Sequence, residues 1–134
     1  MTIKTSFNHL QIYVSDKNIS FPFYKELLTY LDYKVVDDDG THLGLRNKPT
    51  DIWLKEAPKE NKSKRYHRKN VGINHLAFKV SKKEDVDKFY QEFLIPRGIK
   101  TLYDTPKKFP KYTDNYYAVF FEDPDRIKLE VVFL

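Results

Sequence analysis

The sequence predicts an α+β fold built from two tandem βαβββ modules, and three observations support this. The segment FNHLQIYVSD at residues 7–16 reappears as INHLAFKVSK at residues 73–82, 66 positions later. The same offset continues into the next segment, where Phe-Tyr at 23–24 recurs at 89–90. Each copy is followed by apolar residues at helical spacing and then by three short strand-like segments. A repeat with a fixed period indicates one structural unit that occurs twice.

The first module is predicted at residues 6–57 and begins with a strand, because polar and apolar side chains alternate through residues 7–14. A helix is expected at residues 19–31, where apolar residues recur at helical spacing and Ser20 is a candidate N-cap. Three short strands then complete the module, at residues 33–36, 41–46 and 51–56.

The second module, at residues 72–134, repeats this order. A strand at residues 73–80 leads to a helix that Ser81 and Glu84 are expected to cap as a capping box. Strands follow at residues 99–103, 116–121 and 127–133. Between the modules, residues 58–71 form a basic linker without apolar periodicity, and residues 105–114 are predicted to be a second long loop.

Composition restricts the classes of function. A chain of 134 residues, 40% of them hydrophobic, is of single-domain size and can bury a core, so residues 1–134 are predicted to form one domain. The net charge of +5 favours acidic small molecules and is too small to indicate nucleic-acid binding. The N-terminus has no secretory leader, and no apolar run approaches the roughly 20 residues that span a bilayer. We therefore expect a soluble cytoplasmic protein, without membrane or nucleic-acid partners.

Strand alternation predicts which side chains share a sheet face with the repeated histidines. In the first module the polar face is expected to carry His9, Gln11, Tyr13, His42, Arg46, Trp53 and Lys55. In the second module it is expected to carry His75, Lys79, Tyr117, Lys128 and Glu130. Contact with solvent alone does not require such a set, so both faces are candidate functional surfaces.

Two βαβββ modules, a histidine in the first strand of each, and a carboxylate in the last strand within DPDRIKLEVV strongly resemble the vicinal oxygen chelate superfamily. This group includes glyoxalase I, extradiol dioxygenases and bleomycin-resistance binding proteins. The resemblance covers residues 7–133 and implies that the modules curl into a cup-shaped mixed sheet. It also implies one divalent metal ion (Fe, Mn, Zn, Ni or Co) with His9, His75 and Glu130 as ligands.

A metal held by two histidines and one carboxylate can bind and activate an oxygen-containing substrate. Two imidazoles and one carboxylate leave coordination positions open for a bidentate oxygen or anionic substrate, on which the metal acts as a Lewis acid. The resemblance therefore implies a lyase, isomerase, dioxygenase or transferase that acts on a small molecule. Lys55 and Tyr117 are candidate catalytic residues. The candidate substrate-binding residues are Gln11, Tyr13, His42, Arg46, Trp53, Lys79 and Lys128.

Lys55 departs from the family pattern. Alignment of IWLK at residues 52–55 with IKLE at residues 127–130 pairs Lys55 with Glu130, where glyoxalase-I-like proteins carry a fourth metal ligand. A protonated lysine cannot bind a metal, so glyoxalase I proper is disfavoured. The lysine suits an anionic group on a substrate, or it pairs with Glu130 in a pocket without metal.

Other interpretations remain open at this level. One alternative is a metal-free protein of the bleomycin-resistance type that sequesters a ligand, and another is an interaction module with a vestigial cup. His42 is also compatible with an ordinary strand-end histidine, and His67 in the linker with a solvated one. The linker's lysines and arginines suit a solvated loop or a lid over an anionic ligand. Exposed sheet edges favour a homodimer.

Overall fold

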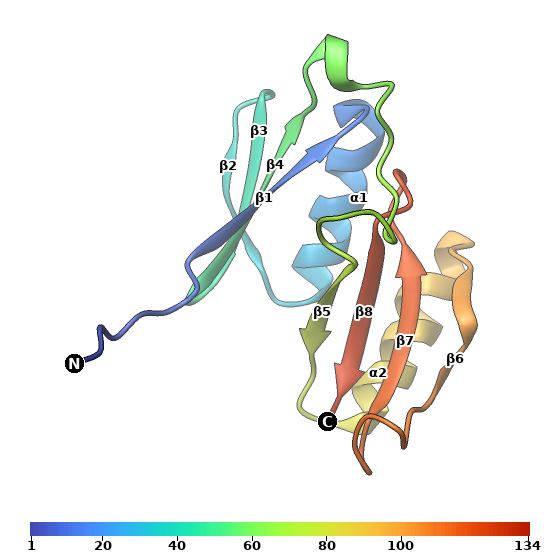
Figure 1. Cartoon of the computed structure of the whole chain (residues 1–134). Helices are drawn as coiled ribbons and strands as arrows, with labels where there is room; N and C mark the ends of the chain where they lie inside the picture. The colour runs from blue at the N-terminus through green and yellow to red at the C-terminus, as the bar shows by residue number, and fades with distance from the viewer. The chain divides into compact units, whose positions relative to one another are not determined.

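Both halves of the chain adopt the predicted βαβββ order, which confirms the fold class (Figure 1). The computed structural model describes all residues from 1 to 134 and divides them into two compact units, residues 1–64 and 65–134. Each unit contains one four-stranded sheet and is described by itself below.

The first unit consists of one mixed sheet and one long helix. Its elements are β1 (His9–Val14), α1 (Lys17–Tyr30), β2 (Lys34–Asp38), β3 (His42–Asn47), β4 (Thr50–Glu56) and a short turn η1 (Lys59–Asn61). The strand order is β1-β4-β3-β2, with β1 parallel to β4 and the other pairs antiparallel. Buried leucines and aromatic residues of α1 cover one face of this sheet, which leaves the opposite face open.

The helix α1 begins earlier than predicted. Its N-cap is Asp16, whose carboxylate accepts a hydrogen bond from the Asn18 backbone N–H at 2.9 Å. Ser20 lies buried inside the helix, so the predicted Ser20 cap was wrong. The physical reason is that β1 ends at Val14 and α1 already begins at Lys17, so the capping side chain comes from Asp16, directly before the helix.

The second unit repeats the arrangement with a more irregular helix. Its elements are β5 (His75–Lys79), α2 (Lys83–Phe89), η2 (Tyr90–Leu94), η3 (Ile95–Arg97), β6 (Thr101–Lys108), β7 (Tyr117–Glu122) and β8 (Lys128–Phe133), with strand order β5-β8-β7-β6. Gly98 ends the helical segment with a left-handed φ of 63°. The predicted capping box is absent, because Lys82 takes the N-cap position without a side-chain hydrogen bond.

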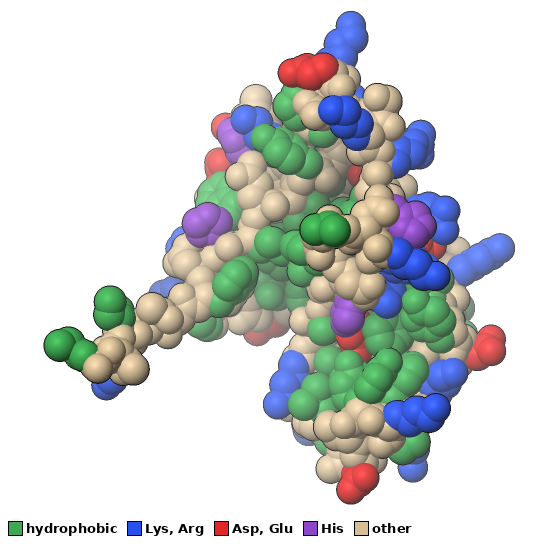
Figure 2. Space-filling model, in the orientation of Figure 1, with side chains coloured by type: hydrophobic (Ala, Val, Ile, Leu, Met, Phe, Trp, Pro, Cys, Tyr) green, Lys and Arg blue, Asp and Glu red, His purple; other side chains and the backbone are tan.

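The sheet of the second unit is apolar on both faces. On the helix side, Phe89 lies 5.2 Å from Phe93 and 5.4 Å from Phe121 between ring centroids, and all three rings are buried. On the opposite side, Ala118, Phe120 and Val132 are also buried. A face that was expected to be polar therefore contains its own small hydrophobic cluster, and Figure 2 shows hydrophobic side chains gathered on this unit.

In the first unit, Gly44 makes room for the ring of Trp53 on the neighbouring strand. A Cβ atom on Gly44 would lie 2.6 Å from Cζ3 of Trp53, well inside van der Waals contact. Gly44→Ala should therefore push the indole away and lower the free energy of unfolding by about 1–3 kcal/mol. Urea unfolding followed by circular dichroism measures the stability, and the fluorescence of Trp53, the only tryptophan of the chain, reports the displaced indole.

The control for this prediction is a double-mutant cycle. Combining Gly44→Ala with Trp53→Leu should recover most of the stability that Gly44→Ala loses, because the colliding ring is gone. An unchanged unfolding midpoint for Gly44→Ala alone would show that the indole does not lie over Gly44.

Candidate functional site

The structure brings two of the predicted metal ligands together in the second unit. His75 begins β5, and Glu130 lies two residues beyond Lys128, the residue that pairs with His75 on β8. The Nε2 atom of His75 is 3.1 Å from Oε2 of Glu130. The Glu130 side chain is fully buried, whereas that of His75 is 35% exposed. A buried carboxylate thus meets an imidazole that solvent can reach.

The neighbouring Asn74 fixes the tautomer of His75. Its amide nitrogen donates to the backbone carbonyl of Arg68 at 3.0 Å, which sets the orientation of the amide. Its amide oxygen is then the atom 2.8 Å from His75 Nδ1. An amide oxygen can only accept, so Nδ1 carries the proton. In the neutral ring, Nε2 therefore presents a lone pair toward Glu130.

The carboxylate of Glu130 is only half satisfied. Its Oε1 atom accepts a hydrogen bond from the Tyr116 hydroxyl, but the buried Oε2 atom has no hydrogen-bond donor. His75 Nε2 lies within ion-pair distance of Oε2 without hydrogen-bond geometry. With a neutral His75 ring, two electron-rich atoms face each other beside a buried carboxylate, and a cation between them, a proton or a metal ion, would compensate the buried charge. This pair fits one edge of a divalent metal site.

Tyr116 is a site residue that the sequence did not predict. Burial raises the pKa of its hydroxyl first, and the hydrogen bond to Glu130 and the negative charge of that carboxylate raise it further. The hydroxyl therefore remains a donor to Glu130 across the physiological range. Alternation within this strand could not reveal it, because only the pairing of Phe120 with Glu130 shows that the even-numbered residues share the face of the carboxylate.

The predicted position of Tyr117 on the polar face was wrong. Because of that same alternation, Tyr117 faces α2, where its hydroxyl donates to Asp87 Oδ1 at 2.6 Å and Lys83 Nζ lies 4.7 Å from the ring centroid. Burial, the hydrogen bond to Asp87 and the charge of Asp87 together raise the pKa of Tyr117 to about 12. Tyr117 is thus a packing residue of the helix side.

This contact predicts a pH dependence of stability. The folded state holds the Tyr117 proton more tightly than the unfolded chain, whose ordinary tyrosine pKa is 10.0. The resulting stabilisation should be complete below about pH 10 and decline as the pH rises toward 12. Urea unfolding at a series of alkaline pH values measures it, with Tyr117→Phe as the control that removes this component. Tyrosinate absorbance that assigns Tyr117 an ordinary pKa would contradict the prediction.

Next to the His75–Glu130 pair lies an open cavity of about 650 Å³. It is lined by Asn74, His75, Tyr103, Phe109, Tyr112, Tyr116, Phe120 and Lys128. The structure thus places the predicted substrate-binding residue Lys128 beside the candidate ligand His75. Lys79 lies exposed at the end of β5 and does not line this cavity.

The first unit repeats the Asn-His arrangement. His9 begins β1, and its Nδ1 atom lies 2.6 Å from the amide oxygen of Asn8. The ring nitrogen must again be the donor, which leaves Nε2 of His9 with a lone pair. In both units the asparagine before the histidine thus selects the tautomer that exposes Nε2, as hydrogen-bond partners of metal-binding histidines commonly do.

The strand register corrects the predicted counterpart of Glu130. His9 pairs with Asp51 and His75 pairs with Lys128, so the residues two positions further along are Trp53 and Glu130. Trp53 is thus the equivalent of Glu130, and the pairing of Lys55 with Glu130 was wrong. Alternation within one strand shows which face a residue takes but not how strands shift relative to each other.

Arg46 already has a partner inside the protein. Its guanidinium forms two hydrogen bonds to Asp51, each 2.9 Å long. These bonds and the positive charge of Arg46 lower the pKa of the Asp51 carboxyl, and His9 lowers it slightly further. Asp51 was not among the predicted site residues, yet it pairs with His9 across the strands and shares its face.

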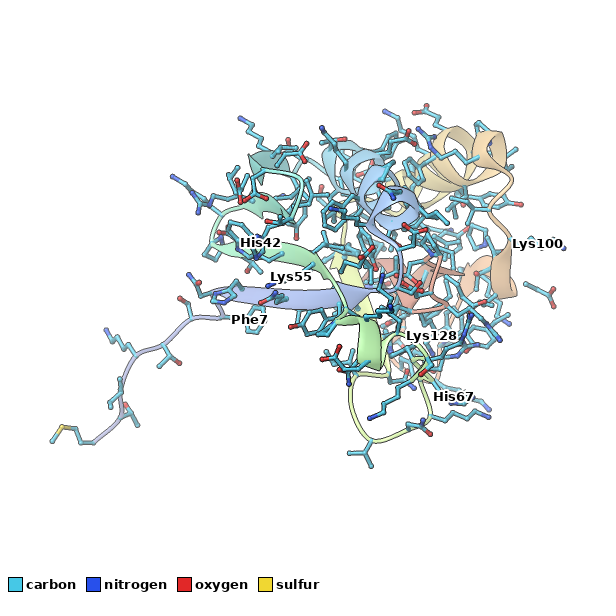
Figure 3. The ribbon with its side chains drawn as sticks, turned by 90° about the horizontal axis from the view of Figure 1, so that it is seen from above. Phe7, His42, Lys55, His67, Lys100 and Lys128 are labelled. Carbon is cyan, nitrogen blue, oxygen red and sulfur yellow. The ribbon has the colours of Figure 1, made fainter.

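The other predicted residues of the first unit share the open sheet face. His42 and Lys55 lie opposite each other on β3 and β4 (Figure 3). Gln11 lies opposite Trp53, and Tyr13, which is 55% exposed, lies opposite Lys55. The loop before β3 fixes His42, since its backbone N–H and that of Thr41 donate to Asp39. These two bonds lower the pKa of Asp39 to about 2.

Within each unit, no three His, Asp or Glu side chains gather as a metal-binding group. The second unit contains the candidate ligands His75 and Glu130, and the first unit contains the candidate ligand His9. No helix has the length and apolar character needed to cross a membrane.

Two βαβββ units, each opening with an Asn-His pair on its first strand, define a protein of the vicinal oxygen chelate class. The sequence model of the Glyoxalase/Bleomycin resistance protein/Dioxygenase superfamily matches residues 6–131, and the chain belongs to this superfamily.

Individual relatives agree with this assignment. The chain is 35% identical over 125 residues to the protein YqjT of Bacillus subtilis (strain 168), covering 93% of this chain and 96% of YqjT. It resembles the crystal structure of a candidate glyoxalase from Bacillus halodurans, with a TM-score of 0.86, 33% identity and coverage of 96% and 95%. A lactoylglutathione lyase from Agrobacterium tumefaciens shares the fold, with a TM-score of 0.69, 18% identity and coverage of 98% and 96%.

Proposed function

We propose that this chain is a metalloenzyme that acts on a small oxygen-rich or anionic molecule, with His75, Glu130 and His9 as ligands of one divalent ion. The observation that carries the proposal is the approach of two electron-rich atoms, His75 Nε2 and Glu130 Oε2, at 3.1 Å. The buried Oε2 atom lacks a donor, so a cation would supply what the protein leaves missing.

The chain's own groups prepare these atoms for a ligand role. Asn74 and Asn8 hold the protons on the Nδ1 atoms, so both histidines offer Nε2. Tyr116 holds one carboxylate oxygen of Glu130 and leaves the other free. When bound, the metal would act as a Lewis acid that polarises a carbonyl or stabilises negative charge on oxygen. The reaction class that fits is that of a lyase, isomerase, dioxygenase or transferase.

Because Trp53, and not Lys55, is the counterpart of Glu130, the number of protein ligands in the proposed metal site is limited to three. Trp53 stands at the equivalent position of the first unit, and an indole is not a metal ligand. The proposed set therefore has three protein ligands and leaves the remaining positions open. This arrangement again disfavours glyoxalase I proper. Fe, Mn, Zn, Ni and Co all suit two imidazoles and one carboxylate.

Metal loading and removal test the proposal. Protein treated with EDTA and then titrated separately with Mn²⁺, Co²⁺, Ni²⁺ and Zn²⁺ should bind about one ion per chain. Calorimetry measures the stoichiometry. The melting temperature should rise with free metal concentration, as expected for a ligand that binds only the folded state. Protein that binds none of these ions would contradict the proposal.

A second candidate function is ligand sequestration without metal, of the bleomycin-resistance type. The aromatic cavity of the second unit favours it, because such a cavity can hold a molecule without any reaction. A protein that binds an organic ligand with equal affinity before and after EDTA treatment, and no divalent ion, would support this alternative.

The sheet edges and the amino-acid composition also suggest how the protein assembles and where it is located. We propose a homodimer, because each four-stranded sheet ends in edge strands, which present unpaired backbone groups. Light scattering across a range of concentrations measures the assembly. The absence of cysteine fits a reducing compartment such as the cytoplasm.

A further inference from the structure

We propose that the cavity beside His75 binds a flat aromatic molecule carrying an anionic group, and that Lys128 recognises the charge. The inference rests on the proposed function, since it names the class of molecule that the site would take. The inference does not require the metal, because the cavity and the charged side chain of Lys128 both belong to the second unit.

The wall of the cavity is a connected set of aromatic rings. Phe109 stacks on Tyr112 at 5.6 Å between centroids with nearly parallel planes, and Tyr116 meets both of them edge-on. Phe120 continues the set, with its centroid 5.5 Å from Phe109 and 5.9 Å from the ring of His75. The rings therefore extend from the hairpin tip to the candidate metal ligand.

Several of these rings remain exposed to solvent. Tyr112 is 63% exposed and Tyr103 is 46% exposed. Large aromatic side chains that line an open cavity at the surface indicate a binding site. Offset-stacked and edge-to-face contacts with a planar ring would bury these faces, which an aliphatic chain does less well. The volume of about 650 Å³ lies within the usual range for small-molecule sites.

The hairpin between β6 and β7 holds three of the rings in place. The backbone N–H of Phe109 donates to the carbonyl of Tyr116 at 2.9 Å, and the N–H of Tyr112 donates to the carbonyl of Phe109 at 3.0 Å. These bonds close the loop on itself. The aromatic wall is thus preorganised, which lowers the conformational cost of binding.

Lys128 provides the charge complementarity. Its Nζ atom lies 3.3 Å from the Tyr103 hydroxyl, and 5.3 and 5.4 Å from the ring centroids of Tyr103 and Phe120. It forms no ion pair in the structure. The carboxylate opposite Lys128 on β7 is Glu122, which is already bound by Arg68 at 2.8 Å and Arg126 at 3.3 Å. A lysine held over apolar rings without a carboxylate favours an anionic ligand.

The acidic groups near the cavity do not cancel this charge. Glu130 is fully buried behind Tyr116 and His75, and neither Asp104 nor Asp114 lines the cavity. Lys128 is the only lining side chain that is charged when His75 is neutral. Because Lys128 and His75 are cross-strand neighbours, the anionic end of a bound ring would lie on the His75 side of the cavity.

Calorimetry with 2-naphthoate tests the inference on EDTA-treated full-length protein. The comparison ligands are 2-naphthalenemethanol, which keeps the ring without the charge, and hexanoate, which keeps the charge without the ring. We expect 2-naphthoate to bind at least about tenfold more tightly than either, as a charge-assisted bond combined with ring contacts implies. Lys128→Gln should remove the preference for the anion, and Lys128→Arg should retain it.

A matched control separates this lysine from lysines in general. Lys83 also lies over a tyrosine ring, that of Tyr117, but on the helix side of the same sheet. Lys83→Gln should leave 2-naphthoate binding unchanged. Tyr112→Ala should weaken 2-naphthoate and its alcohol to a similar extent, because the ring is exposed and its loss removes stacking area rather than charge.

The outcomes distinguish this inference from the proposed function. Binding of 2-naphthoate with the expected Lys128 dependence in EDTA supports the inference even if no metal binds. Equal binding of acid and alcohol, or unchanged binding by Lys128→Gln, overturns it even if the metal site is confirmed. A dimer that Tyr112→Ala converts to a monomer in light scattering, with no 2-naphthoate bound by the wild type, also overturns it, because a second copy then covers the aromatic rings.

Discussion

Replacing His75 with alanine is expected to lower the affinity for a divalent ion by at least about a hundredfold. Loss of partners that only orient a ligand already costs about 10- to 100-fold, and loss of the ligand itself should cost no less. The chain should remain folded, because His75 is 35% exposed and its removal leaves no large cavity. Calorimetric titration with Zn²⁺ or Mn²⁺ measures the affinity, and circular dichroism checks the fold.

His67→Ala is the matched control for this experiment. His67 also has its Nδ1 atom held by a hydrogen bond, here from the Lys69 backbone N–H at 3.1 Å, but it lies in the basic segment and does not line the cavity beside His75. Its replacement should leave metal affinity unchanged. Equal affinity of the wild type and His75→Ala would exclude His75 as a ligand.

Glu130→Gln is expected to weaken metal binding by a comparable factor while stabilising the metal-free protein. The amide keeps an oxygen that accepts from Tyr116, and its NH₂ group faces the lone pair of His75 Nε2. The substitution removes a fully buried charge whose Oε2 atom has no donor. We expect the free energy of unfolding in EDTA at neutral pH to rise by about 1–3 kcal/mol.

Glu122→Gln is the control for this substitution and should act in the opposite direction. Glu122 lies on the same sheet, but its carboxylate is paired with Arg68 and Arg126, so loss of its charge should lower stability. Urea unfolding of the wild type, Glu130→Gln and Glu122→Gln in EDTA measures whether each substitution raises or lowers the free energy of unfolding. If Glu130→Gln is less stable than the wild type in the absence of metal, the protein's own groups already compensate the charge of the Glu130 carboxylate, and the prediction is contradicted.

The repeated Asn-His-Leu segment made the fold predictable. Such a repeat fixes the element order of both units at once, and alternation correctly placed His75, Lys128 and Glu130 on one sheet face. The repeat and the alternation of polar and apolar residues are both visible in the sequence without knowledge of how the strands pair. This part of the site could therefore be read from the chain without the structure.

The errors in the predicted site arose where two strands pair. Tyr116 and Tyr117 are neighbours, and only the pairing of Phe120 with Glu130 decides which hydroxyl reaches the carboxylate. Likewise, the assignment of Trp53 in place of Lys55 depends on how far β4 is shifted along β1. Loop lengths and turn geometry set these registers, and alternation within a single strand does not record them.

The basic segment before β5 also has a role that its composition concealed. Its lysines and arginines suit a solvated loop, yet the carbonyl of Arg68 holds the amide of Asn74, which in turn orients His75. The Arg68 side chain anchors this segment to Glu122 at 2.8 Å. A backbone carbonyl leaves no sequence signature, so this contact could be found only in the structure.

The most direct test of the metal site is the state of the two His75 nitrogens before and after metal is added. Long-range ¹H–¹⁵N correlation spectra of uniformly labelled protein distinguish a protonated ring nitrogen from one that carries a lone pair or binds a metal. We predict that Nδ1 of His75 keeps its proton throughout and that one equivalent of Zn²⁺ changes the Nε2 signal. A Zn²⁺ titration that leaves Nε2 unchanged, or that removes the proton from Nδ1 instead, would contradict the proposed site.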